Sequence, residues 1–328
     1  MLTPRQNLME TIKGGNPDRF VKQFEFMEFV RNPHQMNNPK CRRGMLNVKN
    51  LWGITYSWRE DQPGGIPVHT PELTVITNIE NWKDQLTVPR MDYTEEDWAP
   101  FVQAAAEIDR EQIFVAPSIN PGIFEMCHAL MGMEDCLCAL YENPDEMHEL
   151  IECITNWEMK LAEGYCKYVK PDALFHHDDW GGGNSLFMSP ALFEEFFEEP
   201  YTRLYKYYKD HGVEVVVHHS DSYCAELVPN MIRMGIDIWQ GPLTTNNIPE
   251  LIKQYGGQIS FMGGVNSWDV DKPDWSYENS LHYTKEICEA CGKLYFIPCN
   301  TLGGPGECFE GVYAATSKAI DECTKLYF

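Results

Sequence analysis

Three predicted strands each end in side chains that can bind a metal ion or move a proton. The first runs into His-His-Asp-Asp-Trp at 176–180, the second into His-His-Ser-Asp at 218–221, and the third into Cys-Asn at 299–300. In α/β folds the loops at the carboxyl ends of strands carry the chemistry. The three segments are therefore expected to meet at one edge of a sheet.

A zinc site is one chemistry that these residue types offer. His219, Asp221 and Cys299 supply one nitrogen, one oxygen and one sulfur ligand, all of which zinc accepts. Three protein ligands would leave a position open for substrate. Each residue also has a structural alternative: His219 as a hydrogen-bonded core histidine, and Cys299 as a small buried apolar side chain. His218 alternates in direction with His219 along a strand, so we expect it to pack behind the site.

The elements that must position these residues follow a repeating pattern. Short apolar strands alternate with amphipathic helices from about residue 110 onward. The predicted strands are 113–116, 173–175, 213–217, 236–239, 259–262 and 294–297. This alternation predicts a parallel sheet, either closed into a barrel or doubly wound. No Gly-x-Gly-x-x-Gly follows any of these strands, which argues against a dinucleotide-binding fold.

An eight-stranded barrel needs strands from the first third of the chain as well. Segment 20–26 is a candidate for one of them. The stretch from 28 to 110 is rich in Pro, Asn, Gly and Trp and has weak periodicity. An insertion of this length usually forms a lid or subdomain over a site. We therefore predict a single domain over residues 1–328, with 28–110 as a loop-rich excursion covering the barrel mouth.

The composition of the chain limits the kinds of binding partner and the cellular compartment that we expect. The 328 residues carry a net charge of −23, whereas nucleic-acid binding depends on clustered Lys and Arg, so no nucleic-acid partner is expected. No segment approaches the roughly 18–20 consecutive apolar residues of a membrane helix. Twelve cysteines without an export signal predict reduced thiols in a cytoplasmic protein. Cys-Glu-Ala-Cys at 288–291 fits a helix capped by Gly292 better than a redox or zinc motif.

The chain resembles the uroporphyrinogen decarboxylase superfamily, and within it the corrinoid-dependent methyltransferases. The resemblance runs nearly from end to end and implies a (β/α)8 TIM barrel. Five segments carry it: the opening helix and Pro-Asp-Arg turn at 3–19, Trp-Gly-Ile-Thr-Tyr at 52–56, Gly-Gly-Ile-Pro at 64–67, the Asp-Asp-Trp-Gly loop and Ser-Pro helix start within 176–190, and Met-Gly-Gly-Val at 262–265. In addition, His-Ser-Asp-Ser-Tyr at 219–223 lies where the family has His-x-Cys-Gly.

The resemblance implies a component of an anaerobic O-demethylation system. Such an enzyme moves a methyl group from a small methoxylated substrate, here expected to be a phenyl methyl ether, to the cob(I)alamin of a separate corrinoid protein. Thiol methyltransferases of the family hold zinc through His-x-Cys and a second Cys. His219 and Cys299 take the outer two places, but Asp221 stands in the place of the first Cys. An aspartate oxygen is a harder ligand than a thiolate sulfur. A metal ion held by harder ligands suits an ether oxygen better than a thiol.

Further roles are expectations from the same resemblance. Asp178 or Asp179 would be a general acid or an orienting group, although a helix cap or a loop brace is an equal alternative. Trp180, Tyr223 and Trp239 would wall an aromatic pocket, although aromatic residues at strand ends more often belong to the core.

Three other functions remain open. One is methyl transfer from a methylated corrinoid to a thiol or folate, and another is a corrinoid-binding module without activity. The third is decarboxylation. The decarboxylase has an arginine-rich motif near its first strand, where this chain has Glu25 and Glu28. Acidic residues there would repel a polycarboxylate substrate.

Overall fold

The computed structural model describes residues 1–62, 64–302, 304 and 308–328. Within these residues, seven parallel strands form one sheet in the order β1-β5-β6-β7-β8-β9-β10. The strands are β1 (Met27–Val30), β5 (Phe114–Ile119), β6 (Ala173–His177), β7 (Val215–His219), β8 (Ile238–Gln240), β9 (Ser260–Val265) and β10 (Phe296–Asn300).

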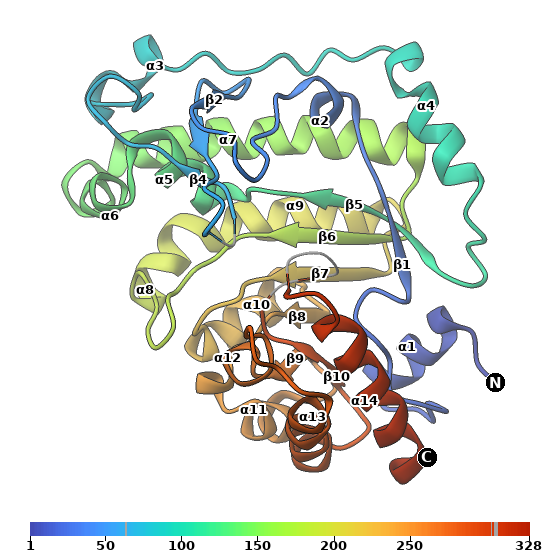
Figure 1. Ribbon diagram of the computed structural model, residues 1–328. Coiled ribbons are helices and arrows are strands. Elements are labelled where there is room, and N and C mark those ends of the chain that lie inside the picture. The colour runs from blue at the N-terminus through green and yellow to red at the C-terminus, as the bar shows by residue number, and fades with distance from the viewer. Residues whose placement is uncertain (63, 303, 305–307) are drawn as a thin grey trace.

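Helices surround this sheet on its outer face (Figure 1). Each strand from β5 to β10 is followed by at least one helix, as the predicted alternation requires. The helices after β5 are α5 (Ile123–Met131), α6 (Met133–Glu142), α7 (Pro144–Gly164), α8 (Pro190–Phe193), α9 (Glu199–Asp210), α10 (Val228–Met234), α11 (Ile248–Tyr255), α12 (Ser267–Val270), α13 (Tyr277–Cys291) and α14 (Val312–Tyr327). In the described part of the chain, none of the helices has the length and apolar character needed to cross a membrane.

Alternating side chains divide the core into two layers. Along β6, Ala173 and Phe175 belong to an inner apolar cluster inside the barrel, whereas Leu174 packs in the larger layer between sheet and helices. Helix α1 (Pro4–Ile12) adds Leu8 to the inner cluster and lies toward the amino-terminal ends of the strands (Figure 1). The interior is thus packed with apolar side chains below the polar residues that end the strands.

The predicted barrel class is confirmed, with seven hydrogen-bonded strands rather than eight in the described residues. All six strands predicted after residue 110 are present. The predicted strand at 20–26 is wrong, because Phe24 has a positive φ of 59° and the strand begins only at Met27. β1 and β10 are the two edges of the sheet, yet Met27 and Cys299 belong to the same inner cluster. The sheet therefore curls until both edges face one core.

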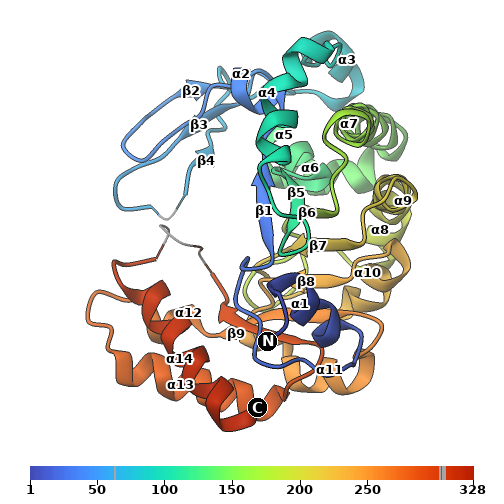
Figure 2. The ribbon, with the colours of Figure 1, turned by 90° about the vertical axis from the view of Figure 1, so that its right-hand side faces the viewer.

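The long segment between β1 and β5 packs against the end of β5 and against α5 through its first half. It contains α2 (Pro33–Asn37), β2 (Val48–Lys49), β3 (Thr55–Ser57), β4 (Ile66–Pro67), α3 (Trp82–Gln85) and α4 (Glu95–Ala106). β2, β3 and β4 form a small antiparallel sheet that projects from the barrel (Figure 2). Gln35 Nε2 donates to the carbonyl of Ser118 in β5 at 2.6 Å, and His69 Nε2 lies 3.1 Å from the carbonyl of Ala129 in α5.

Candidate active site

Two copies of the sequence His-His-x-Asp end β6 and β7, and the strand register places them side by side. His177 pairs with His219 across the two parallel strands. Both side chains continue the inward-facing series of their strands, so both point into the upper end of the barrel. Their rings stack with centroids 4.2 Å apart and planes at 18°.

The first histidine of each pair points the other way. His176 Nε2 lies 2.8 Å from Glu158 of α7, and His218 Nδ1 lies 2.8 Å from the Tyr205 hydroxyl of α9. Burial, reinforced by His176, lowers the pKa of His218 well below its ordinary value. His218 therefore packs behind the site as a neutral side chain, as the alternation along the strand predicts.

Three ligand-forming side chains converge at the strand ends. His177, Asp179 and His219 each offer one ligand atom, and these atoms lie within 4.8 Å of one another. We call these three residues the His/Asp cluster. Two more carboxylates border it: Glu125 Oε2 lies 3.4 Å from His177 Nε2, and Asp221 Oδ2 lies 3.9 Å from His219 Nε2. The side chains of all five are between 12% and 32% exposed, so the cluster is half-buried rather than sealed.

Gln240 fixes the orientation of the His219 ring. Its Oε1 accepts a short hydrogen bond from His219 Nδ1, so this nitrogen carries the proton and Nε2 presents its lone pair to the cluster. Burial, and next His177, lowers the pKa of His219. The imidazole is therefore neutral near neutral pH, which is the form that binds metals.

Histidines are the basic side chains beside the carboxylates of the cluster. Among the described residues, no Lys or Arg forms an ion pair with Glu125, Asp179 or Asp221. Burial, with Asp179 next, raises the pKa of Glu125 well above its ordinary value, and the same two causes raise the pKa of Asp221 to about 7. Two like charges about 4 Å apart repel by about 4 kcal/mol at an effective dielectric constant near 20. A divalent cation would relieve this repulsion.

The donor set fits a metal ion of intermediate hardness. Two imidazole nitrogens and one carboxylate, with two further carboxylates at hand, suit zinc and other first-row divalent ions. His177, Asp179 and His219 are the residues that would hold it, with Glu125 or Asp221 completing the set. The set contains no thiolate.

Asp178 is a buried residue that holds the backbone next to the cluster. Its carboxylate accepts hydrogen bonds from the backbone N–H groups of Phe124 and Glu125, both at 2.8 Å, and a short one from the Tyr201 hydroxyl. It thereby caps the first turn of α5 and fixes the backbone of Glu125. Burial, and next Glu125, raises the pKa of Asp178, while the two amides oppose that rise. Because Asp178 is fully buried, it cannot touch a substrate, whereas Asp179 faces the cluster.

One residue of the excursion and one of α5 interact electrostatically with the carboxylates of the cluster. Burial, and next the charge of Glu125, raises the pKa of Tyr56 in β3. His128 of α5 has its pKa lowered to about 4 by burial and by His69, while Asp179 opposes that shift. Tyr56 and His128 thus lie within electrostatic reach of the carboxylates.

Two of the three aromatic residues predicted to wall a pocket, Trp180 and Trp239, point away from the barrel interior. Trp180 and Trp239 are fully buried in the layer between sheet and helices, so neither can contact a ligand inside the barrel. Trp180 stacks on His218 at 4.0 Å, and Trp239 Nε1 donates to the carbonyl of Ser220 at 2.9 Å. Trp239 points outward because it precedes the inward-facing Gln240 by one residue. Tyr223 is half-buried, and its backbone N–H donates to the carbonyl of Gly182 at 2.7 Å.

Cys299 does not join the cluster in the described residues. It lies in the inner apolar cluster with 2% exposure, and burial raises the pKa of its thiol. Its strand is separated from β7 by β8 and β9. The ligand set predicted from His219, Asp221 and Cys299 is therefore replaced by one centred on His177, Asp179 and His219.

A signal for His177 was present in the sequence. The repeat of His-His-x-Asp at 176–179 and 218–221, at the ends of consecutive strands, predicts matching inward positions. Glu125 and Gln240 had no such signal, since their places depend on the cap of α5 and on the register of β8.

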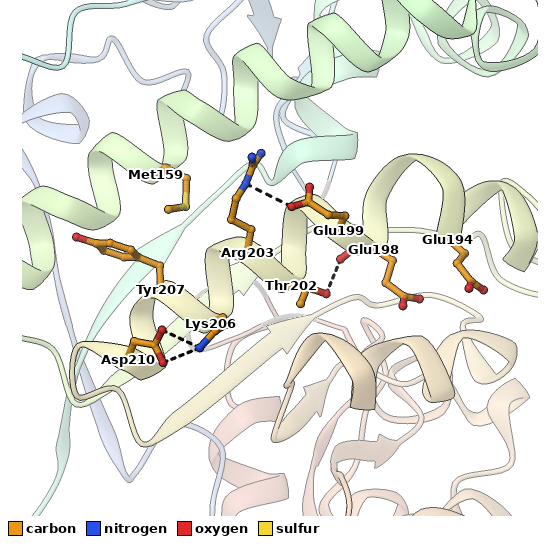
Figure 3. A pocket seen from close by; sticks show the side chains of 9 residues that line it. All are labelled: Met159, Glu194, Glu198, Glu199, Thr202, Arg203, Lys206, Tyr207 and Asp210. Carbon is orange, nitrogen blue, oxygen red and sulfur yellow. Dashed lines mark hydrogen bonds and ion pairs between the residues drawn. The ribbon is translucent and has the colours of Figure 1, made fainter.

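A surface groove of about 610 Å³ lies between α7 and α9 (Figure 3) and shares no lining residue with the cluster. Its charged side chains largely pair with one another, including Lys206 with Asp210 at 2.8 Å and Arg203 with Glu199 at 3.8 Å. It offers no set of converging ligand atoms. Its lining is Met159, Glu194, Glu198, Glu199, Thr202, Arg203, Lys206, Tyr207 and Asp210.

Comparison with known families agrees with the barrel fold. The family model described as uroporphyrinogen decarboxylase (URO-D) matches residues 53–270. The chain belongs to the uroporphyrinogen decarboxylase family. Among solved structures, a methyltransferase from Methanosarcina mazei superposes with a TM-score of 0.64 over 98% of this chain and 99% of its own, at 16% sequence identity. That identity establishes a shared fold. No curated protein matches the sequence.

Proposed function

We propose that this member of the uroporphyrinogen decarboxylase family transfers a methyl group from a small methoxylated aromatic compound to the cob(I)alamin of a separate corrinoid protein. The observation that carries the proposal is the His/Asp cluster at the carboxyl ends of β6 and β7. The full-length structural likeness to a protein named a methyltransferase supports the choice of reaction within the family.

The difficult part of this reaction is the leaving group. The methyl group leaves the ether oxygen without its bonding electrons, and the new bond to cobalt forms with the electron pair of cob(I)alamin. The electrons of the broken C–O bond stay on a phenolate oxygen, which later takes a proton from water. Zinc bound by His177, Asp179 and His219 would act as a Lewis acid that stabilises the charge developing on that oxygen.

The residues of the chain have distinct tasks in this scheme. Gln240 keeps the lone pair of His219 Nε2 directed into the site. Asp178 holds the backbone of Glu125, and Tyr56 of the excursion lies within electrostatic reach of Glu125. If an acid rather than a metal assists the reaction, Asp179 is the carboxyl group placed to donate the proton.

Two features favour an ether over the other substrates considered. The cluster contains no thiolate, which a zinc site for thiol activation would use. It also carries carboxylates without a nearby Lys or Arg in the described residues, and such a site repels the polycarboxylate substrate of a porphyrinogen decarboxylase.

The test uses free cob(I)alamin and a panel of methoxyphenols under anaerobic conditions. We expect the wild-type protein to consume the cob(I)alamin absorption and release the matching phenol. His219→Ala should lower the rate by about 100-fold or more, while Cys299→Ser keeps it. Wild-type protein that demethylates none of the panel, or a His219→Ala variant that matches wild type, would contradict the proposal.

A further inference from the structure

Residues 31–59 differ in charge from the rest of the chain. They contain six of the 26 Lys and Arg residues and none of the 49 Asp and Glu residues. All six cations are exposed, and we call this segment the basic lobe. They are Arg31, Lys40, Arg42, Arg43, Lys49 and Arg59. The basic lobe is therefore positively charged, whereas the protein as a whole has a net charge of −23.

The cations of the basic lobe form no ion pair with the described residues. Across the described ranges, none of the six cations lies within 4.0 Å of a carboxylate. Arg43 instead donates to the carbonyl of Glu60 at 2.8 Å, and its guanidinium lies 5.5 Å from the centre of the Trp58 ring. Burial, with Arg31 and Arg42 next, lowers the pKa of Lys40, so like charges are crowded here.

Exposed apolar side chains are interspersed with these cations. Met36, Met45, Leu46 and Leu51 are between 41% and 60% exposed. Methionine and arginine are both enriched where proteins bind one another. Exposed apolar side chains interspersed with unpaired cations complement a protein surface that carries carboxylates among apolar side chains.

The segment that carries the basic lobe contacts the barrel at the end of β5. Gln35 binds the end of β5, and Tyr56 lies within electrostatic reach of Glu125. The small sheet that carries the lobe projects from the barrel (Figure 2). A macromolecule seated on it would be held beside the cluster.

We infer that the basic lobe is the docking surface for an acidic protein. Resting on the proposed function, we further infer that this protein is the corrinoid carrier that accepts the methyl group. A nucleic acid fits less well, because the remainder of the chain would repel a phosphate backbone and the lobe presents apolar side chains between its cations.

Docking can be tested without any assumption about the reaction. The probe is fluorescein-labelled poly-L-glutamate, measured by anisotropy against salt concentration. Arg42→Glu/Arg43→Glu and, independently, Lys49→Glu/Arg59→Glu should weaken binding about tenfold or more at low salt. The control Lys293→Glu/Lys325→Glu makes the same charge change after α13 and in the last turn of α14, and should bind as wild type does. Equal binding by wild type and both lobe variants, or tighter binding of polyuridylate than of polyglutamate, would overturn the inference.

The carrier assignment needs a comparison of two methyl acceptors. Arg42→Glu/Arg43→Glu should lower kcat/KM about tenfold with a corrinoid carrier protein and leave the rate with free cob(I)alamin unchanged. An equal rate with the carrier for wild type and variant would refute the assignment. Wild-type protein inactive with free cob(I)alamin would refute the proposed function instead, and the polyglutamate result would still decide docking.

Discussion

Replacing Asp178 tests whether the active-site loop depends on a buried carboxylate. Its two oxygens accept from the N–H groups of Phe124 and Glu125 and from the Tyr201 hydroxyl. In Asp178→Asn one oxygen becomes an NH2 group, so at least one of these donors meets another donor. A hydrogen bond to a charged group contributes about 1.5–3 kcal/mol, and a buried donor left unsatisfied costs about 1–3 kcal/mol. We expect Asp178→Asn to lower the free energy of unfolding by about 2–4 kcal/mol.

Two further variants calibrate this value. Asp178→Ala removes the carboxylate from all three donors, leaving Phe124 N–H only the Tyr201 oxygen at 3.5 Å, and should cost about 4–6 kcal/mol. Tyr201→Phe removes one donor and should cost about 1–2 kcal/mol. Since Asp178 fixes the backbone of Glu125, Asp178→Asn should also weaken zinc binding by about 10- to 100-fold. Urea unfolding and zinc titration with a competing chelator measure the two effects. An Asp178→Asn protein within about 0.5 kcal/mol of wild type, with unchanged zinc affinity, would refute the role given to this carboxylate.

Two predictions concern other parts of the fold. Burial lowers the pKa of His34 to about 4 in the folded state from an ordinary value of 6.5, so its contribution to the free energy of unfolding is full above about pH 6.5. That contribution, at most about 3 kcal/mol, is lost as the pH falls toward 4. In urea unfolding, His34→Gln should reduce the change of the free energy of unfolding with pH between pH 7 and 4.5. An unchanged pH dependence would show that other groups cause this change. In Gly122→Ala the new Cβ would lie 2.6 Å from Asp178 Cβ and 2.7 Å from His176 Cε1, which should cost about 2–3 kcal/mol. Gly183→Ala, with no atom within 4 Å of its Cβ, is the matched control, and equal stability of the two variants would contradict this packing.

Most of the barrel could be predicted from the alternation of strands and helices, and the site could be predicted only in part. The strand ends at 176–180 and 218–221 were recognisable because apolar runs stop there in histidine and aspartate. Which of these side chains meet depends on register, and the pairing of His177 with His219 is a property of the folded sheet. Cys299 was predicted as a ligand because it ends a strand and because the family resemblance gives that place a ligand. In the fold, two strands separate β10 from β7, and the cysteine packs with the inner apolar cluster.

Other features depend on contacts between distant segments. Glu125 reaches His177 because Asp178, more than 50 residues away, caps the turn that carries it. The outward direction of Trp239 follows from the one-residue alternation with Gln240, which only the bounds of β8 fix.

Metal content tests the central claim most directly. Wild-type protein, His177→Ala, His219→Ala and Cys299→Ser would be purified without chelators and analysed by mass spectrometry for zinc and other first-row metals. The His/Asp cluster predicts about one metal ion per chain in wild type and in Cys299→Ser, with loss in both histidine variants. Loss of the metal in Cys299→Ser together with its retention in His177→Ala would contradict the cluster and restore the thiolate-containing ligand set.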